Sequence, residues 1–232
     1  MNVISEIFNI ILYRPLFNAL ILLYQLVPGN DFGVSVILLT IFIRIILYPL
    51  MTQSIKSQKV LSELQPKIQE IQKRYKNDQE RQAKEILQLY QKEKINPFSS
   101  LFPILIQLPI LIALYQVFWK GFQPAEMVNL YSFVPKPEVI NPFFLGIINL
   151  SQKNLIFAFL AGFAQFFQSK IMMGKSRKEK GSTAQFSDVF QKQMLYFVPI
   201  FTFIILMRLP SAISLYLVVT TLFSIIQQQF IF

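Results

Sequence analysis

The chain has 232 residues, of which 53% are hydrophobic and 15% charged, and its formal net charge is +10. Globular domains carry about a quarter of charged residues, so this composition is typical of a membrane protein. The sequence has no cysteine and no histidine, which excludes disulfides, thiol catalysis and the usual zinc sites.

The first segment, residues 1–30, carries a polar stripe along an otherwise apolar sequence. We expect an amphipathic helix with a kink near Pro15, lying in the outer membrane interface. A sixth membrane span is the alternative, and Arg14 in its middle disfavours it. The polar residues that recur at helical spacing are Asn2, Glu6, Asn9, Tyr13, Arg14, Asn18 and Gln25.

Five apolar stretches follow, and a spanning helix needs about 20 such residues. We expect membrane helices at 31–55, 96–120, 153–174, 192–208 and 209–230. The third and fourth are shorter than usual in their uncharged parts, 154–169 and 193–207. The predicted fold class is an all-α membrane protein with five transmembrane helices.

Residues 56–95 predict a helical hairpin between the first two spans. Apolar residues recur at helical spacing from Val60 to Tyr75 and from Ala83 to Tyr90, on either side of the turn KND. Pro66 is expected in the first turn of a helix or at a kink. The hairpin is either a solvated spacer or a docking arm with Pro66, Tyr75 and Tyr90 as candidate contacts, and the sequence does not favour the second.

The basic residues are unevenly distributed, with ten of the 22 in residues 51–96 and six in residues 170–192. Positively charged loops stay in the cytoplasm. We therefore expect the hairpin and the loop 175–191 inside, the loop 121–152 outside, the N-terminus outside and the C-terminus inside. No direct nucleic-acid partner is expected, because the loops also hold acidic residues and no basic stripe with aromatics is present.

Two sequence features were weighed as signs of nucleotide binding or catalysis, and neither has the context that this chemistry requires. The segment SKIMMGKS, Ser169 to Ser176, is one residue from a P-loop, but it leaves a membrane helix instead of a strand. Every Asp and Glu lies outside the spans, so no carboxylate pair is available for acid–base catalysis. We expect no enzyme activity, no catalytic residue, no cofactor and no metal.

Arg44 stands near the middle of the apolar stretch LLTIFIRIILYPLM, where a charge costs about 2.5–3.5 kcal/mol on insertion scales. Snorkelling toward the cytoplasmic surface is the structural explanation. The spans also hold neutral polar residues, each of which alone is more often a helix–helix hydrogen bond. Together with Arg44 they predict a hydrated, client-binding groove in the bundle. These residues are Thr40, Gln107, Gln165, Gln168, Thr220, Thr221 and Gln227.

Five segments, in order, resemble the core of YidC-type membrane protein insertases, over residues from about 10 to 230. The arginine-bearing first span and the proline-rich second span are the most specific. The last span departs from the family: Leu217 replaces a frequent Trp, Thr220 or Thr221 replaces an Asn, and a turn glycine is missing. The segments are GVSVILLTIFIRIILYPL, LQPKIQEIQKRYKND, NPFSSLFPILIQLPILIALYQVF, AQFFQSKIM and LPSAISLYLVVTTLFSIIQQ.

The resemblance implies a bacterial cell-membrane protein without ATPase activity. Its positive groove, centred on Arg44, would receive the polar outer part of a nascent membrane protein client and release the client helix into the lipid bilayer along the third and fifth spans. The hairpin would contact the targeting machinery, so the signal recognition particle machinery, the Sec translocon and the ribosome are candidate partners. The ending QQQFIF has no basic tail, so we expect no tail-mediated ribosome docking and a minimal, Gram-positive-like form.

Two alternatives come from other classes. A small-solute transporter or channel would use the same polar cavity, but it predicts an internal repeat, and the sequence shows none. A structural assembly factor would use the hairpin to recruit partners and the spans only as an anchor, which predicts that Arg44 is dispensable. An intramembrane enzyme is last, for want of a nucleophile and base.

Overall fold

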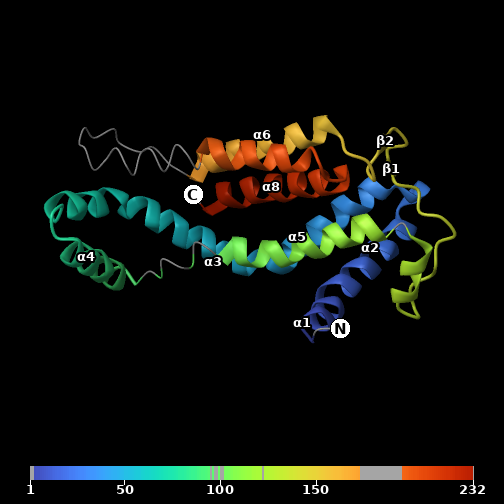
Figure 1. The fold of residues 1–232 in the computed structure, drawn as a ribbon, viewed down its shortest axis with the longest axis horizontal. Helices are drawn as coiled ribbons and strands as arrows, with labels where there is room; N and C mark the ends of the chain where they lie inside the picture. Colours follow the sequence, from blue (N-terminus) through green and yellow to red (C-terminus); the bar gives the residue numbers. More distant parts are fainter. Residues whose placement is uncertain are drawn as a thin grey trace.

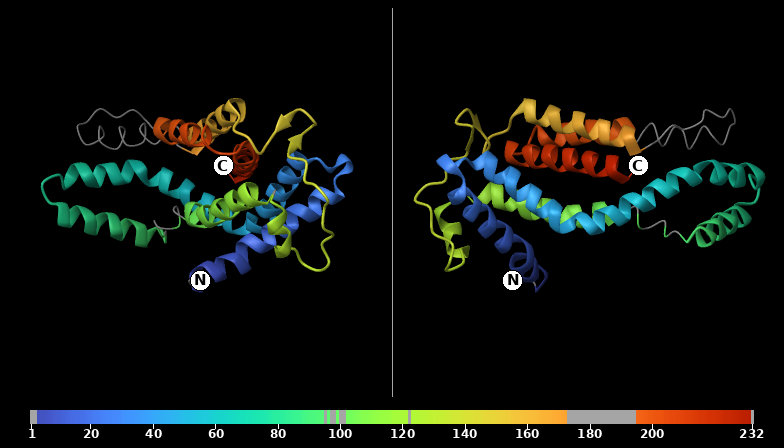
Figure 2. Two further views of the ribbon diagram at one scale, coloured as in Figure 1. Left: turned by 45° about the vertical axis from the view of Figure 1, so that its right-hand side comes forward. Right: turned by 180° about the vertical axis from the view of Figure 1, so that it is seen from behind.

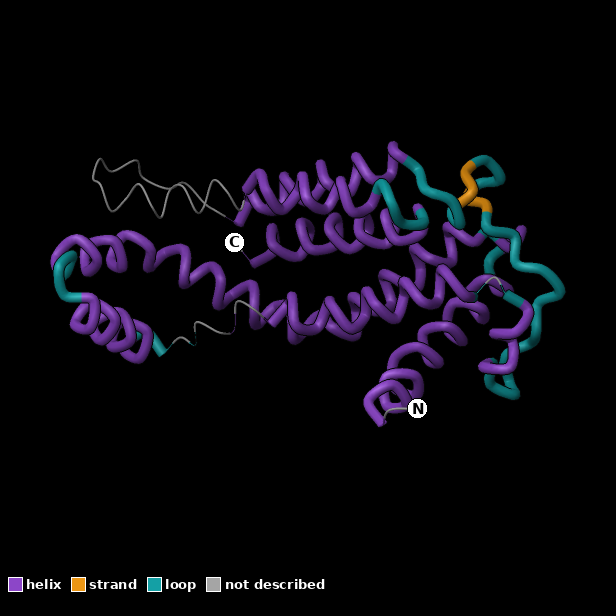
Figure 3. The backbone as a smooth tube through the Cα atoms, viewed as in Figure 1, coloured by secondary structure: helices purple, strands orange, loops and turns teal. Residues whose placement is uncertain are grey.

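The computed structural model of the chain describes residues 3–94, 96, 99, 102–121, 123–172 and 195–231. The predicted basic loop 175–191 lies outside these residues. The spans lie side by side along one long axis, with the hairpin at one end and an irregular loop at the other (Figure 1). Strand is confined, within the described residues, to two short segments in that loop (Figure 3). The predicted all-α fold class is confirmed.

The N-terminal helix is continuous but irregular. It consists of α1 (Val3–Phe8), a π-helical turn η1 (Asn9–Tyr13) and α2 (Arg14–Leu26). In the π-turn, the Arg14 N–H bonds the Asn9 carbonyl, five residues back. Pro15 lacks an N–H and crowds the preceding turn, which a π-turn accommodates. The irregularity predicted near Pro15 is therefore a π-helical turn just before it.

The first span and the first arm of the hairpin form a single helix, α3 (Phe32–Arg74), of 43 residues. At about 1.5 Å per residue it is about 65 Å long, roughly twice the hydrocarbon thickness of a bilayer. The Asp31 carboxylate accepts the Val34 N–H at 2.8 Å and so caps the start of the helix. Pro66 lies inside α3, so of the two predicted places the first turn of a helix is excluded, and a kink at Pro66 stays a prediction.

The hairpin is confirmed. After a turn at Tyr75–Lys76, helix α4 (Gln79–Lys92) returns antiparallel to the end of α3 (Figure 2). Asp78 caps α4 by accepting the Arg81 N–H at 2.9 Å. An ion pair between Lys67 Nζ and Glu93 Oε1 at 3.0 Å joins the two arms.

The later predicted spans correspond to α5 (Phe102–Lys120), α6 (Leu155–Met172), a helix Leu195–Leu206 and α8 (Ser211–Ile231). By length and hydropathy, four helical segments could cross a membrane: Val3–Leu26, α3, α5 and α8. The third and fourth spans are shorter, as their uncharged stretches predict. Length alone therefore permits the N-terminal helix to span, and its interfacial position stays a prediction.

The loop between α5 and α6 is ordered by contacts with α2. It contains a short 3-10 helix η4 (Pro124–Asn129) and an antiparallel pair of strands, β1 (Phe143–Phe144) and β2 (Ile148–Asn149). The Asn18 side chain accepts the Tyr131 N–H at 2.6 Å and donates to the Asn129 carbonyl at 3.0 Å. The polar stripe of the N-terminal helix is thus used, at least in α2, to hold this loop.

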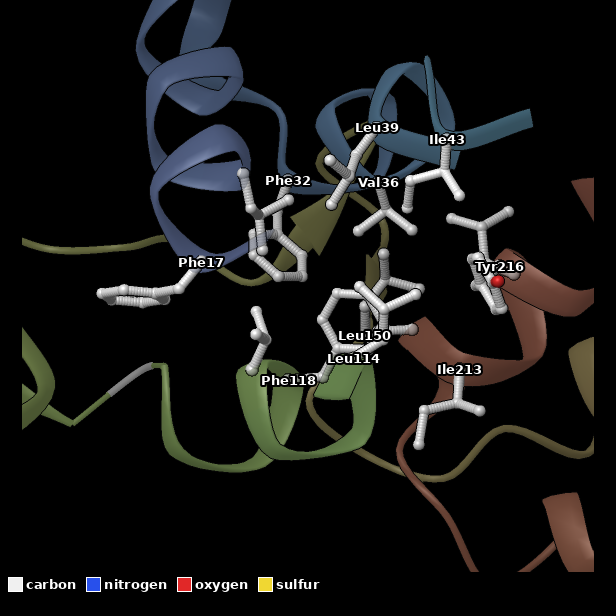
Figure 4. Close-up of a cluster of buried hydrophobic side chains, with 14 of the residues drawn as sticks. Phe17, Phe32, Val36, Leu39, Ile43, Leu114, Phe118, Leu150, Ile213 and Tyr216 are labelled. Carbon is white, nitrogen blue, oxygen red and sulfur yellow. The ribbon is translucent and has the colours of Figure 1, made fainter. Parts of the chain in front are cut away.

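The apolar core fills the loop end of the bundle. Phe32 of α3 lies edge-on against Phe118 of α5, with ring centroids 6.1 Å apart, and Phe17 of α2 and Ile213 of α8 belong to the same cluster (Figure 4). All four side chains are buried. Because Arg44 directly follows the core residue Ile43, the polar site begins where this apolar packing ends.

Candidate functional site

Arg44 lies inside the bundle, with its side chain only 7% exposed. Its Nη2 donates to Gln107 Oε1 at 3.4 Å, and Gln107 Nε2 donates to the Tyr216 hydroxyl at 2.7 Å. Three helices, α3, α5 and α8, therefore meet in one polar chain. The guanidinium is held between helices and does not snorkel to the surface.

The charge of Arg44 has no acidic partner in the spans. No Asp or Glu occurs at residues 32–62, 95–125, 139–178 or 189–232. The bond to Gln107 is longer than the about 2.7–3.2 Å of a good N–H···O bond, so it is weak. A guanidinium has five N–H donors, and within the described residues only this one has a partner. Arg44 can therefore bind water or an incoming acceptor without first breaking a strong contact.

Thr40 lies one turn before Arg44 but is not part of this chain. Its hydroxyl donates to the Val36 carbonyl at 2.6 Å within the same helix. Such a back-bond satisfies the hydroxyl locally. Thr40 is buried, so it lines the region without contacting Arg44 through a hydrogen bond.

Gln227 forms a second polar contact between α8 and α3, toward the hairpin end. Its Nε2 donates to the Tyr48 carbonyl at 3.1 Å and to the Thr52 hydroxyl at 2.8 Å. Thr220 and Thr221 are buried on α8 between this contact and Tyr216. The predicted residues of the last span thus lie along one helix that faces α3.

The two glutamines of α6 are not brought to Arg44. Gln165 and Gln168 are half-buried, and α6 packs mainly against α8. Within the described part of the chain, no hydrogen bond joins either glutamine to Arg44, Gln107 or Tyr216. Any role of theirs belongs to the α6–α8 side of the bundle.

The sequence-based site missed Tyr216 and several further polar residues of α8. Ser214 Oγ and Gln228 Oε1 are buried and have no hydrogen-bond partner among the described residues. Buried polar atoms of this kind require water or a ligand. The signal was available, because Tyr216, Thr220, Ser224 and Gln227 recur at helical spacing.

The hairpin candidates do not form one surface. Pro66 is exposed on α3, whereas Tyr75 and Tyr90 are half-buried. The Arg81 guanidinium lies 5.1 Å over the Tyr75 ring, and burial raises the pKa of the Tyr90 hydroxyl. Tyr75 therefore has a contact within the hairpin and Tyr90 is partly buried there, and their role as docking contacts stays a prediction.

A family model described as "60Kd inner membrane protein" matches residues 22–232. A protein of Fusobacterium nucleatum named "Membrane protein insertase YidC" is 36% identical over 202 residues, which cover 87% of this chain and 86% of that protein.

Two longer relatives carry the same name. The protein of Geobacter metallireducens is 32% identical over 222 residues, and that of Buchnera aphidicola is 35% identical over 223 residues. Each alignment covers 95% of this chain but only 36% and 37% of the respective relative. The chain therefore spans most of the Fusobacterium protein and little more than a third of the other two.

Proposed function

The chain belongs to the 60Kd inner membrane protein family, and from this premise we propose that it is a membrane protein insertase. In this proposal the polar end of a client segment binds at Arg44, inside the membrane. The client's apolar helix then passes into lipid along α6 and α8. The clients are nascent membrane proteins with short polar tails.

One observation carries the proposal: Arg44 is buried among neutral partners only. An arginine paired with a carboxylate would be a structural ion pair, and removing its partner would leave a costly buried charge. Arg44 instead has one weak bond to an amide and a charge that no residue of the spans neutralises. Such a group is suited to a transient negative partner from outside the protein.

The energies are of the right size for this role. A carboxylate about 4 Å from the guanidinium gains about 4 kcal/mol at an effective dielectric near 20. This offsets part of the penalty for carrying a polar tail into the membrane. The buried polar atoms of α8 without partners offer sites for water, which would offset more of it.

Release needs no nucleotide in this scheme. The apolar side chains of Phe159, Phe163 and Phe167 on α6 are more than 40% exposed and form a lipid-like surface on that helix. A client helix that moves from this surface into lipid exchanges one set of apolar contacts for another, so this last transfer costs little free energy. The removal of its apolar residues from water drives the step as a whole. The hairpin lies on the cytoplasmic side in this proposal and contacts the targeting machinery there.

The test is insertion of a single-span client into liposomes that contain the purified protein. Two clients would differ only in the outer tail, acidic in one and neutral in the other. We expect Arg44→Ala to abolish insertion of the acidic client, Arg44→Lys to retain much of it, and the neutral client to depend less on Arg44. Insertion is expected without added nucleotide.

Arg208→Ala is the matched control, because Arg208 is an exposed arginine before α8 that lies outside the Arg44–Gln107–Tyr216 chain. Equal loss for both clients would contradict charge pairing. Full activity of Arg44→Ala would contradict the groove and favour an assembly factor anchored by its spans. Leakage of a small solute through the wild type would instead favour a channel.

A further inference from the structure

A cavity lies where the hairpin meets the membrane helices, away from Arg44. It has a volume of about 760 Å³ and lies between α3, from Leu50 to Val60, and a second group of residues before and at the start of α5. That second group is Glu93, Lys94, Asn96, Ser99, Phe102 and Leu105. Small-molecule sites in proteins have volumes of about 300–1,000 Å³. We refer to it as the hairpin-base cavity.

The lining changes from apolar to basic along the bundle axis. Leu50 of α3 and Phe102 and Leu105 of α5 form the part nearer the centre of the spans. Phe102 and Leu105 are 44% and 62% exposed, so this wall is not covered by other parts of the protein. Lys56 and Lys94 line the end nearer the hairpin.

The two lysines lie at the level where the chain leaves the apolar layer. Lys56 is the first charged residue after the uncharged run 45–55, and Lys94 is the last one before the uncharged run that begins at 95. Long lysine side chains at such positions place their ammonium groups among lipid headgroups. The charge of the cavity therefore lies at headgroup depth, with Lys56 on α3 and Lys94 in the turn after α4.

The cavity has a net positive charge. Its acidic residue, Glu93, is already bonded to Lys67 at 3.0 Å across the hairpin. Within the described residues, neither Lys56 nor Lys94 forms an ion pair. The wall between them is fixed by the Ser54 hydroxyl, which donates to the Ser99 carbonyl at 2.8 Å.

We propose that the hairpin-base cavity binds an anionic phospholipid, with its phosphate between Lys56 and Lys94 and an acyl chain against Leu50, Phe102 and Leu105. Basic clusters next to membrane spans attract anionic lipids, and here a cavity adds an apolar wall at acyl depth. A free phosphate would satisfy the lysines but leave that wall exposed, so the lipid is the better occupant. The inference does not depend on insertase activity.

The experiment uses the full chain in vesicles of phosphatidylcholine with a few per cent of a photoactivatable lipid. The probe is phosphatidylglycerol with a diazirine in the upper part of one acyl chain, and the same group on phosphatidylcholine is the reference. We expect phosphatidylglycerol to label peptides containing Leu50, Phe102 or Leu105 well above the reference, with no client present. Equal labelling by both lipids would overturn the proposal.

The variant Lys56→Gln/Lys94→Gln tests the charge. Each lysine near the surface contributes about fivefold in affinity for anionic lipid, so the pair should weaken labelling about thirtyfold at low probe concentration. Lys76→Gln/Lys84→Gln is the matched control, because both lysines are exposed, on the same hairpin and absent from the cavity lining. A similar fall in both variants would show only general attraction to the surface and would contradict a site.

Inorganic phosphate distinguishes the two sources of the anion. We expect phosphate to reduce labelling no more than chloride at equal ionic strength. Displacement of the probe by phosphate at a much lower concentration would assign the cavity to a soluble phosphate and overturn the lipid assignment.

Discussion

At the scale of single residues, the site depends on a few polar contacts between helices. Tyr216 is 1% exposed, and its hydroxyl accepts the only hydrogen bond that the Gln107 amide nitrogen donates within the described residues. Gln107 in turn accepts from Arg44. Tyr216 therefore fixes the direction of the amide that Arg44 contacts.

Tyr216→Phe should lower stability, because it removes this acceptor and leaves the Gln107 N–H unpaired. The expected loss is about 1 kcal/mol, or a fall in the unfolding midpoint of about 2–4 °C. Thermal unfolding in detergent micelles measures it. Tyr48→Phe is the control, because Tyr48 is 41% exposed and keeps its ring contact with Phe223 as Phe. Equal midpoints for the two variants would show that the Gln107 bond contributes nothing.

Gly33 is a second residue with a specific role. A Cβ added at Gly33 would overlap the side chain of Phe144 on β1, so the absence of a side chain allows α3 to contact the strand pair. Gly33→Ala should therefore destabilise the loop end by about 1–3 kcal/mol, as overpacking does elsewhere. The quantity to measure is again the unfolding midpoint in micelles.

The variant Phe144→Gly separates this overlap from backbone effects, because even the Cβ of residue 144 would lie 2.6 Å from a Cβ added at Gly33. In that background Gly33→Ala should be neutral or slightly stabilising, because alanine is the better helix former. The difference between the two backgrounds is the coupling free energy of the pair. Additive effects of the two substitutions would contradict the overlap.

The sequence found some of these residues and missed others for a physical reason. Arg44 and Gln107 stand out because a polar group in an apolar span is costly wherever it faces. Tyr216 was missed although its helical spacing with Thr220 and Gln227 is visible in the sequence, because its ring is apolar and only the fold decides whether its hydroxyl meets a partner. The role of Gly33 could not be predicted either, because it depends on contact with Phe144, which lies 111 positions further along the chain.

At the scale of elements, the polar face of the N-terminal helix holds a loop in place, which its amphipathic pattern alone does not indicate. The stripe was interpreted as a face for the outer interface, and it carries hydrogen bonds to the loop between α5 and α6. Tyr13 of η1 donates to Glu126 Oε2 at 2.6 Å, and Arg14 Nε of α2 donates to the Asn129 carbonyl at 3.1 Å. Outside the stripe, the Tyr24 hydroxyl of α2 accepts the Asn141 N–H at 2.8 Å. Periodicity shows that a face is polar, but a polar face is equally suited to water and to the backbone of a loop.

Asn18→Leu should release the loop without opening a cavity, since the side chains are similar in size. It removes the acceptor of the Tyr131 N–H and the donor to Asn129. Hydrogen exchange at the Tyr131 amide should accelerate about five- to tenfold, as expected for the loss of a net 1–1.5 kcal/mol. Gln25→Leu, which loses a contact only to the Pro135 carbonyl, is the control and should leave that amide protected. Equal protection in Asn18→Leu would show that packing alone holds the loop.

At the scale of the whole molecule, the sequence predicted the all-α membrane class, the hairpin and the short third and fourth spans. Uncharged stretches and helical periodicity are local properties, so they are visible without the fold. The continuity of α3 through Pro49 and Pro66 was not predicted, because each proline removes one hydrogen bond while the rest of a 43-residue helix stays intact. One sequence also does not show which face of each helix packs against which neighbouring helix.

The side of the membrane on which each segment lies is a property of the whole molecule, and the N-terminal helix is the part to test. Val3–Leu26 is long enough to cross, yet Arg14 and Asn18 near its middle bind Asn129 and Tyr131 of the loop that joins α5 to α6. That loop lies at the end of the bundle opposite the hairpin, and the N-terminal helix runs obliquely to the other helices there (Figure 1). A helix whose middle is bound at that end cannot have its first residues on the hairpin side without drawing the loop into the membrane.

Because the chain has no native cysteine, single substitutions report sidedness directly. The positions are Glu6→Cys in α1, Lys136→Cys in the loop and Lys76→Cys in the hairpin turn, all exposed. A membrane-impermeant maleimide added to sealed vesicles should label Glu6→Cys together with Lys136→Cys, and Lys76→Cys only after the vesicles are opened or inverted. Labelling of Glu6→Cys with Lys76→Cys would make the N-terminal helix a sixth span. Such a span would place Arg14, with Asn18 and its loop contacts, at membrane depth, so this one result also decides whether the membrane layer holds one arginine or two.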